Sequence, residues 1–218
     1  MLAFLHTARA HVATFEQLAR ELDETIPVQH RVEEGLLAET LTAGMLTNRV
    51  RTGLASAISA LARDGAALIV CTCSTLGAAA EAVPVSNCAV MRIDRPMAEE
   101  AVSSGRRIIV LAALRSTLAP TMDLLRQVAT SAQRSPVVVQ VLNEAAWQLF
   151  ESGDKSGYAV AIARTIEATV VQGDLVLLAQ ASMAPASELV RHLGIPVLSS
   201  PRSGVIAAIS QYRNMTSG

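Results

Sequence analysis

The chain has 218 residues, of which 51% are apolar, 17% are charged and only 3% are aromatic, with a formal net charge of −1. This composition excludes extended disorder, and the absence of a basic block and of stacking aromatics argues against a nucleic-acid partner. No apolar run reaches the ~18–20 residues of a membrane span, and three cysteines make no even disulfide framework, so we expect no membrane partner and a cytoplasmic protein.

Apolar runs and amphipathic stretches alternate along the first hundred residues. Five apolar residues, from Ala66 to Val70, run directly into Cys71, which is typical of a strand buried on both faces. Small and hydroxylated residues follow, and a Gly/Ala run then begins a helix near Gly77. The other strands expected in this part are 2–5, 26–30 and 85–91, and the expected helices are 11–23, 33–46 and 47–63.

After Gly105 the order of elements starts over. The expected strands are 107–113, 136–142, 175–179 and 195–198. The expected helices are 117–131, two within 144–171, 185–193 and 203–213. Strands that alternate with helices in this way predict parallel pairing and right-handed crossovers.

The repetition is also visible in the residues themselves. Residues 68–81 align with 175–188 without a gap, which places Cys73 on Gln180 and Thr75 on Ser182. We therefore predict an α/β fold made of two pseudo-symmetric Rossmann-like (flavodoxin-like) halves, each with a parallel four-stranded sheet. The first half comprises residues 1–97 plus 200–218 and the second comprises 98–199.

Cys73 is the candidate reactive atom because it falls at the carboxyl end of a parallel strand, where α/β sheets bind ligands. Amides at the start of the next helix attract anions and lower the pKa of a nearby thiol. The equivalent edges of the two halves would face each other across a cleft, which is a usual place for a small ligand. The alternative is a buried structural thiol, which is also our reading of Cys71. No nearby residues complete a metal site with these two thiols.

The Cys73-Ser74-Thr75 turn, within a pair of similar α/β halves, resembles the aspartate/glutamate/hydantoin racemase superfamily over essentially the whole chain. In that family each half supplies one cysteine, and the thiol/thiolate pair removes and returns the α-proton of a carboxylate. The family's Cys-Asn-Thr motif matches this turn. Its second motif, Gly-Cys-Thr or Gly-Cys-Ala-Gly-Met, matches Ala179-Gln180-Ala181-Ser182-Met183. Its Asp-Ser pair falls on His6-Thr7 and its threonine loop on Arg115-Ser116-Thr117.

The resemblance implies that Cys73 is catalytic and that His6 is a second acid/base or polarises the thiol. His30, at the end of the neighbouring strand, is a further candidate. Hydroxyls and amides would bind the carboxylate and stabilise an enediolate-like intermediate, although N-capping is the alternative for the hydroxyls. These substrate-binding residues are Thr7, Ser74, Thr75, Ser116, Thr117, Gln180, Ala181 and Ser182. The charged segment 92–97 would either present charge at the cleft or form a solvated, salt-bridged turn.

Gln180 departs from the family pattern because an amide neither gains nor loses a proton at neutral pH. Two-cysteine racemisation is therefore not available from these residues. Arylmalonate decarboxylase, a relative, keeps one cysteine in the second half, and maleate isomerase uses its first-half cysteine as a nucleophile. We expect a cofactor-independent racemase- or isomerase-type enzyme for a small carboxylate, with a decarboxylase or a cis–trans isomerase as alternatives. A non-catalytic carboxylate-binding protein is a further alternative, and relatives suggest a homodimer or higher homo-oligomer.

Overall fold

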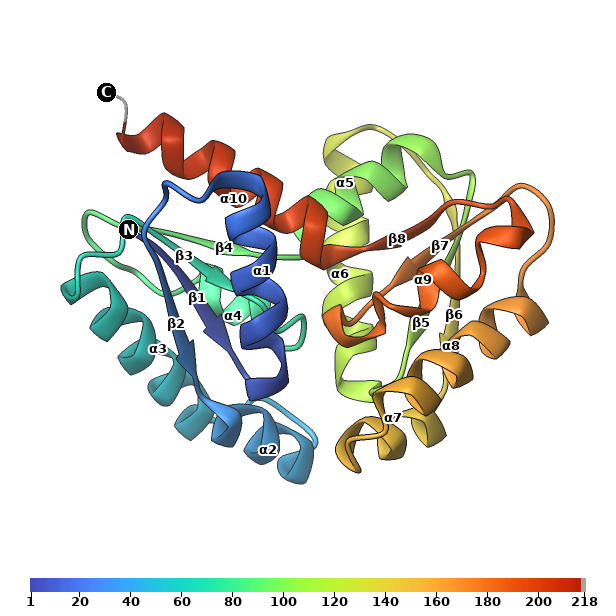
Figure 1. The fold of residues 1–218 in the computed structure, drawn as a ribbon, viewed down its shortest axis with the longest axis horizontal. Helices are drawn as coiled ribbons and strands as arrows, with labels where there is room; N and C mark the ends of the chain where they lie inside the picture. Colours follow the sequence, from blue (N-terminus) through green and yellow to red (C-terminus); the bar gives the residue numbers. More distant parts are fainter. Residues whose placement is uncertain (217–218) are drawn as a thin grey trace. The chain divides into compact units, whose positions relative to one another are not determined.

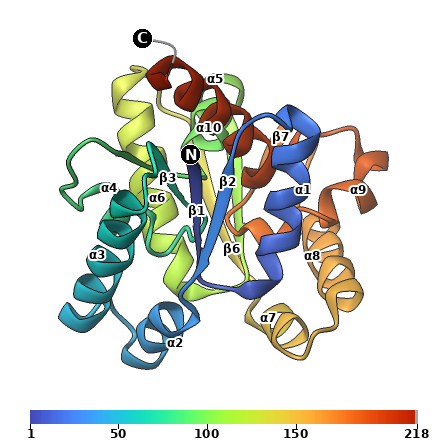
Figure 2. The same ribbon diagram turned by 60° about the vertical axis from the view of Figure 1, so that its left-hand side comes forward.

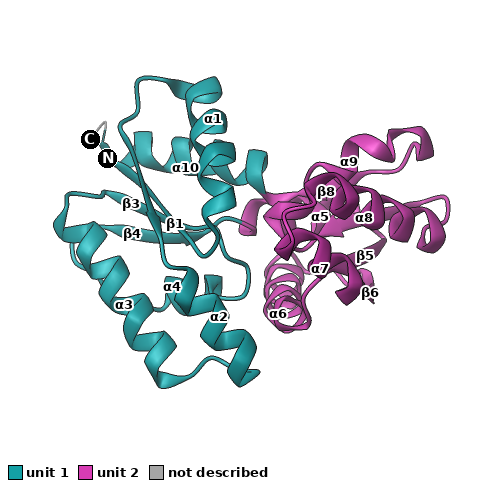
Figure 3. Ribbon diagram, turned by 60° about the horizontal axis from the view of Figure 1, so that its bottom comes forward, with its two compact units in different colours: residues 1–93, 201–218 teal, residues 94–200 magenta. Residues whose placement is uncertain are grey.

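The computed structural model describes residues 1–216, which fold into two compact units (Figure 3). Unit 1 comprises residues 1–93 and the chain from Pro201 onward, and unit 2 comprises residues 94–200. Each unit holds a four-stranded sheet with helices on both faces (Figure 1). The predicted α/β fold with two parallel sheets is confirmed, while the domain bounds given above stay a prediction.

The sheet of unit 1 has the strand order β2-β1-β3-β4, and all of its pairs are parallel. Its strands are β1 (Leu2–His6), β2 (Val28–Val32), β3 (Leu68–Cys71) and β4 (Ala89–Arg92). The central strands β1 and β3 are buried at every residue, which explains their unbroken apolar runs. β2, β3 and β4 all begin later than expected. β2 begins after Pro27, which has no N–H for a ladder, and β4 begins after Asn87, whose φ of 58° interrupts an extended chain.

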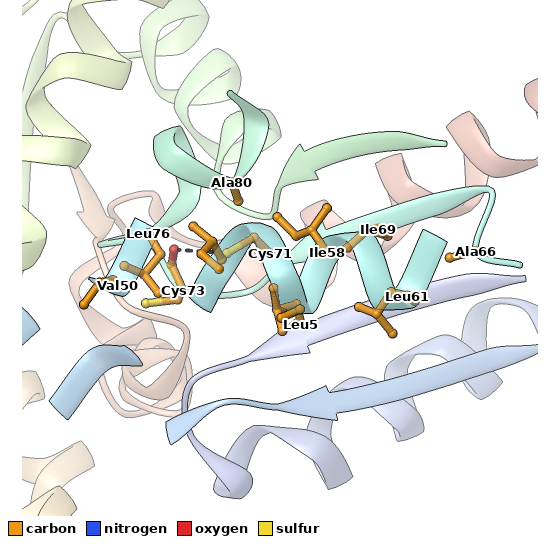
Figure 4. Packing of buried hydrophobic residues seen from close by; sticks show 13 residues of the cluster. Leu5, Val50, Ile58, Leu61, Ala66, Ile69, Cys71, Cys73, Leu76 and Ala80 are labelled. Atoms are coloured by element: carbon orange, nitrogen blue, oxygen red, sulfur yellow. Dashed lines mark hydrogen bonds between the residues drawn. The ribbon is translucent and has the colours of Figure 1, made fainter. Parts of the chain in front are cut away.

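The helices of unit 1 divide between the two faces of its sheet. They are α1 (Val12–Asp23), which follows the short helix η1 (Arg9–His11), α2 (Glu34–Ala43), α3 (Asn48–Arg63), α4 (Gly77–Glu81) and α10 (Ser200–Thr216). Figure 2 shows α1 on one side of β1 and α3 on the other. The α3 face carries the apolar cluster drawn in Figure 4, in which Leu54 and Ile58 pack against Leu5 and Ile69. Residues of α1 instead meet Phe4 and His6, because side chains alternate between the faces of a strand.

The last helix completes unit 1 through a very close approach. A Cβ added to Gly204 would lie 2.4 Å from the carbonyl oxygen of Ile93, so only glycine lets α10 reach the end of β4. Farther along the helix, Arg213 Nη2 lies 2.5 Å from Asp23 Oδ2 on α1. α10 begins three residues before the expected start at residue 203.

The sheet of unit 2 has the order β6-β5-β7-β8, again all parallel. Its strands are β5 (Arg107–Ala112), β6 (Val137–Leu142), β7 (Asp174–Leu178) and β8 (Val197–Ser199). One face packs on α5 (Arg95–Ser104) and α6 (Arg115–Ser131), and the other on α7 (Glu144–Glu151), α8 (Lys155–Thr169) and α9 (Ala186–Leu189). The single helix expected over 185–193 is wrong. The chain there forms η2 (Ala181–Met183), α9 and η3 (Arg191–Leu193), and Val190 between the last two has a non-helical ψ of 12°.

The third strand in each unit is followed by the same backbone hydrogen bond. Thr72 N–H donates to the Leu5 carbonyl at 3.0 Å in unit 1, and Ala179 N–H donates to the Leu111 carbonyl at 2.9 Å in unit 2. The two pairs are therefore equivalent, and so are the residues that follow them, Cys73 and Gln180. The structure thus confirms the alignment read from the sequence as far as Cys73 and Gln180.

Candidate functional site

Cys73 lies in the loop between β3 and α4, at the carboxyl end of the sheet of unit 1. Its side chain is 8% exposed and belongs to the same apolar cluster as Val50 and Leu76 (Figure 4). Cys71 is 1% exposed within the strand, and its Sγ donates to the Cys73 carbonyl at 3.7 Å. Among residues 1–216, none of the three cysteines forms a disulfide. The position of Cys73 is that of the expected reactive thiol, and its reactivity stays a prediction.

The turn that follows Cys73 is compact and buried. Leu76 N–H donates to the Cys73 carbonyl at 3.1 Å, and the two hydroxyl residues between them, Ser74 and Thr75, are 6% and 4% exposed. A Cβ on Gly77 would lie 2.9 Å from the Cβ of Arg92, so the buried arginine side chain packs directly on the first residue of α4. Ser74 and Thr75 therefore lie in a buried turn, and their role in binding a carboxylate stays a prediction.

The charged segment 92–97 is not the solvated turn that was one of its two interpretations. Arg92 is 2% exposed and Asp94 is 1% exposed. Arg92 N–H donates to Glu81 Oε1 at 3.2 Å. Burial on this scale is costly for charged groups unless hydrogen-bond or ionic partners satisfy them. The charges of Arg92 and Asp94 therefore lie inside the protein and not at its solvated surface.

His6, at the end of β1, is part of a chain of four side chains on the α1 face of the sheet. Its Nδ1 lies 2.8 Å from Thr72 Oγ1, and its Nε2 lies 2.9 Å from His30 Nδ1. At the far end, His30 Nε2 lies 2.9 Å from Glu16 Oε2. The three residues on the sheet come from adjacent strands, β2, β1 and the end of β3, and Glu16 comes from α1.

Burial determines the protonation state of His6. The side chain has no exposed surface, and burial is the main cause that lowers the pKa of His6 to about 3, with smaller contributions from His30 and His11. The ring is therefore neutral near pH 7. A catalytic role of His6 stays a prediction, and such a role would have to act through its hydrogen-bond partners.

In unit 2, Gln180 turns its side-chain oxygen onto the backbone of the neighbouring loop. Oε1 accepts a hydrogen bond from Ala113 N–H at 2.6 Å and another from Leu114 N–H at 3.2 Å. These two donors fix which end of the amide is oxygen, so the NH2 group points away from the pair. Gln180 is 8% exposed and supplies no titratable group.

The other residues expected to bind substrate in unit 2 lie near the carboxyl ends of β5 and β7. Ser116 and Thr117 are in the first turn of α6, and the Ser116 Oγ is buried with no hydrogen-bond partner among the described residues. Ala181 begins η2. Ser182 Oγ lies 3.1 Å from the Tyr158 hydroxyl, and burial raises the pKa of Tyr158 to about 12.

Each unit therefore gathers its own share of the expected residues at one sheet edge. Unit 1 gathers His6, Thr7, Cys73, Ser74 and Thr75, and unit 2 gathers Ser116, Thr117, Gln180, Ala181 and Ser182. Sequence reasoning missed Thr72 and Glu16. The alternation of faces along a strand could have placed Thr72 beside His6, but nothing in the sequence fixes the rotation of α1 that brings Glu16 to His30.

The loops that follow the first strand of each unit have the same conformation. Ala8 precedes η1 with φ −147° and ψ 125°, and Leu114 precedes α6 with φ −121° and ψ 129°. In both loops the carbonyl of this residue accepts a hydrogen bond from the N–H three positions later, at 3.1 Å. The backbone around Thr7 and Ala8 is therefore equivalent to the backbone that binds the Gln180 oxygen.

This architecture, with two parallel sheets of the order 2-1-3-4 and polar loops at their carboxyl ends, is that of the racemase fold. The family model for Asp/Glu/Hydantoin racemase matches residues 10–208, and the chain belongs to this family. Membership supports an enzyme of the racemase and isomerase type. No curated protein matches the sequence directly.

Solved structures show the same fold at low sequence identity. Picrophilus torridus aspartate racemase is 17% identical with a TM-score of 0.71, covering 96% of this chain and 93% of its own. Klebsiella pneumoniae allantoin racemase is 17% identical with a TM-score of 0.63, covering 98% and 87%. Arylmalonate decarboxylase is 16% identical with a TM-score of 0.52, covering 96% and 91%. In the part of the chain that the structure describes, no helix has both the length and the apolar character to cross a membrane.

Proposed function

We propose that the chain is a cofactor-independent enzyme that transfers a proton at the α-carbon of a small carboxylate, with Cys73 as its acid/base. The observation that carries the proposal is the hydrogen bonding of Gln180. In unit 2 the side-chain oxygen of Gln180 accepts hydrogen bonds from two backbone N–H groups, those of Ala113 and Leu114. Oxygen atoms of a substrate carboxylate have the same hydrogen-bonding requirement.

The equivalent donors in unit 1 are the N–H groups of Thr7 and Ala8, and the equivalent side chain is Cys73. A cysteine side chain ends at Sγ, two bonds earlier than the Oε1 of a glutamine. A thiol at this position does not reach as far as the Gln180 oxygen does. We propose that a carboxylate oxygen takes the corresponding place in unit 1, which would bring the α-carbon next to the sulfur. Ser74 and Thr75 would donate to the same carboxylate.

The proposed step conserves atoms and charge. A Cys73 thiolate takes the α-proton and becomes a thiol, and the two electrons of the C–H bond pass into an enediolate. Donors that point at the enediolate oxygens stabilise the negative charge as it develops. Return of the proton from Sγ to carbon regenerates the thiolate. One thiol serves one face of the α-carbon.

The fixed amide of Gln180 also favours a second candidate, a decarboxylase that uses a single thiol. In that reaction the electrons of the bond to the leaving carboxyl group form the enediolate as CO2 departs. The Cys73 thiol then protonates the carbon, and the resulting thiolate regains a proton from water. This reaction needs no acid/base at Gln180, whereas racemisation needs a proton donor on each face.

Isotope exchange tests the proposal. Amino acids, hydroxy acids and substituted malonates are incubated in D2O with the wild-type protein, Cys73→Ala and the matched control Cys88→Ala. Wild type and the control should incorporate deuterium at the α-carbon or release CO2. Cys73→Ala should be slower by about 10²–10⁴-fold, which is the contribution of a positioned acid/base.

Two outcomes would overturn the proposal. Equal rates for Cys73→Ala and wild type would remove Cys73 from the reaction. Carboxylates that raise the melting temperature but show neither exchange nor CO2 release would identify a carboxylate-binding protein without catalysis.

A further inference from the structure

The four side chains from Glu16 to Thr72 connect the surface of unit 1 with the loop that carries Cys73. The glutamate is 32% exposed and lines a surface cavity of about 390 Å³ together with Asp23 and Glu24. The opposite end is dry, since His6 has no exposed surface and Thr72 is 3% exposed. Exposure to solvent therefore decreases along the chain from Glu16 through His30, which is 13% exposed, to His6 and Thr72.

One assignment of the protons satisfies every hydrogen bond in this chain. Thr72 Oγ1 donates to the Leu5 carbonyl at 3.2 Å, so it accepts the proton on His6 Nδ1. A neutral His6 with its proton on Nδ1 offers Nε2 as an acceptor, and His30 Nδ1–H donates to it. The hydrogen bond from His30 lowers the pKa of the Glu16 carboxyl, and this carboxylate accepts a second proton, on His30 Nε2. His30 is a cation in this arrangement.

Loss of one proton from this chain reverses the His6–His30 and His6–Thr72 hydrogen bonds and leaves the direction of the bond to Glu16 unchanged. A neutral His30 that still donates to Glu16 has a bare Nδ1, which accepts only if His6 carries its proton on Nε2. His6 Nδ1 then becomes an acceptor, and the Thr72 hydroxyl turns from the Leu5 carbonyl to donate to it. Both arrangements use the same distances between heavy atoms and leave His6 neutral.

We propose that Glu16, His30 and His6 are positioning residues, in which the charge of His30 selects the tautomer of buried His6 and, through it, the direction of the Thr72 hydroxyl beside Cys73. In the first arrangement the Thr72 hydroxyl donates to the Leu5 carbonyl, and in the second it does not. The Thr72 N–H donates to the same carbonyl in both. The backbone position of the Cys73 turn would thus respond to pH. The link to catalysis rests on the proposed function, whereas the tautomer change does not.

Stacking of the rings keeps this chain in register. His6 and His30 lie 5.2 Å apart between ring centroids at 18°, and Phe4 stacks on His30 at 5.4 Å and 14°. Phe15 of α1 covers His6 at 5.4 Å. Two of the three phenylalanines of the protein pack on these rings and oppose their rotation, so His6 changes tautomer without turning.

Other titratable or charged groups near the chain come from all the elements packed around it. On α1 and its start these are Arg20, which binds Glu16, and His11, whose charge acts on His6. On β2 and the residue after it, Arg31 pairs with Glu33. Around the cavity they are Asp23, which binds Arg213 of α10, and Glu24.

Histidine NMR tests the proposal directly. Nitrogen and carbon shifts of labelled His6 distinguish a proton on Nδ1 from one on Nε2, and the charge of His30 is followed in the same samples. His6 should change from the Nδ1–H to the Nε2–H form as pH rises, with the midpoint at which His30 loses its charge. The rate of Cys73 alkylation, followed by mass spectrometry, should show an inflection at the same pH.

Variants separate this coupling from a structural role. Glu16→Gln removes the carboxylate that accepts the proton on His30 Nε2, so the pH at which His6 changes tautomer should differ from that of wild type. Glu21→Gln is the matched control, because Glu21 lies on the same helix and contacts Arg202 instead. In His30→Gln the ring of His6 should keep one tautomer at all pH values.

The proposal is wrong if His6 keeps one tautomer while His30 titrates, or if His6 itself takes up the proton. The Cys73→Ala variant makes failure of the two proposals distinguishable. If its tautomer change persists and its isotope exchange equals that of wild type, the proposed function fails and the positioning chain stands. If Cys73→Ala abolishes exchange and the His6 tautomer is fixed in wild type, the reverse holds.

Discussion

Unit 1 and unit 2 share strand order, register and loop conformation, yet the side chains at their sheet edges have opposite properties. At three equivalent positions unit 1 has His6, Thr72 and Cys73, and unit 2 has Ala112, Ala179 and Gln180. Unit 1 thus carries an imidazole, a hydroxyl and a thiol at these positions, whereas unit 2 satisfies its loop amides with its own amide oxygen. The two units therefore share a backbone conformation but carry side chains of different chemistry at the equivalent positions.

The largest effect should come from His6, which has only an alanine as its counterpart. Its pKa is lowered from 6.5 to about 3, so as pH falls through this window the unfolded chain takes up a proton that the folded protein refuses. Stability therefore decreases as pH falls, by about 1.4 kcal/mol per pH unit and about 5 kcal/mol in all. Urea unfolding from pH 7 to pH 4 measures this slope.

His6→Asn should remove this part of the slope, whatever it does to stability at pH 7. His192→Gln is the control, because the side chain of His192 is 59% exposed and lies far along the sequence in η3. A slope in His6→Asn equal to that of wild type would mean that other groups cause the acid sensitivity.

The amide oxygen of Gln180 should matter next. Gln180→Met keeps the length of the side chain and leaves the N–H groups of Ala113 and Leu114 without an acceptor, at a cost of about 2–4 kcal/mol. Gln180→Glu keeps an acceptor and should retain most of the stability at pH 7. The matching change in unit 1, Cys73→Ala, should cost only about 1 kcal/mol, the transfer energy of roughly one buried group.

Chemical denaturation of the three variants checks this order. Equal losses for Gln180→Met and Gln180→Glu would show that the oxygen is not what stabilises the loop.

Tyr158 makes unit 2 sensitive to alkali in the way that His6 makes unit 1 sensitive to acid. Burial raises its pKa from 10.0 to about 12, so between these values the unfolded chain has lost the phenol proton and the folded protein has kept it. Stability should therefore fall as pH rises from 10 to 12, by at most about 3 kcal/mol. Tyr158→Phe should lose this dependence in thermal unfolding, and Tyr212→Phe should keep it.

Much of the fold could be predicted because buried parallel strands appear in the sequence as unbroken runs of apolar residues. That signal located β1, β3, β5 and β7 and the equivalence of Cys73 with Gln180. The signal failed at the edge strands, which are half buried and whose ends depend on local backbone conformation. The positive φ of Asn87, for example, shortens β4. Local backbone conformation also splits the helix expected over 185–193, at Val190.

The candidate site was predictable as a set of positions and not as a set of bonds. His6 and His30 were candidates because each ends a strand. Their contact depends on β2 lying beside β1, with Phe4 opposite His30 in the register, and strand order is not encoded locally. The hydrogen bonds of Gln180 likewise depend on the loop after β5. In that loop the sequence analysis singled out Ser116 and Thr117, and the structure shows that the N–H groups of Ala113 and Leu114 bind Gln180.

The smallest expected effect uses a helix start at which the two units differ. Asn143 and Glu33 are equivalent residues with nearly the same backbone, φ −123° and ψ 79° against φ −127° and ψ 67°. Asn143 Oδ1 accepts from Ala146 N–H at 3.1 Å, whereas Glu33 makes no side-chain cap. Glu33→Asn should therefore cap α2 and stabilise the protein by about 0.5–1 kcal/mol, since asparagine is a preferred N-cap.

The substitution also removes the ion pair between Glu33 and Arg31, whose side chains are 32% and 36% exposed. Such surface pairs contribute little, so the gain from the cap should exceed the loss. Asn143→Ala is the reciprocal change, and it should destabilise by about 1 kcal/mol or slightly more, because Asn143 Nδ2 also donates to Thr165 Oγ1 at 2.8 Å. Urea midpoints compare the two variants with wild type. If Glu33→Asn lowers the midpoint, the two helix starts are less alike than their backbone angles indicate.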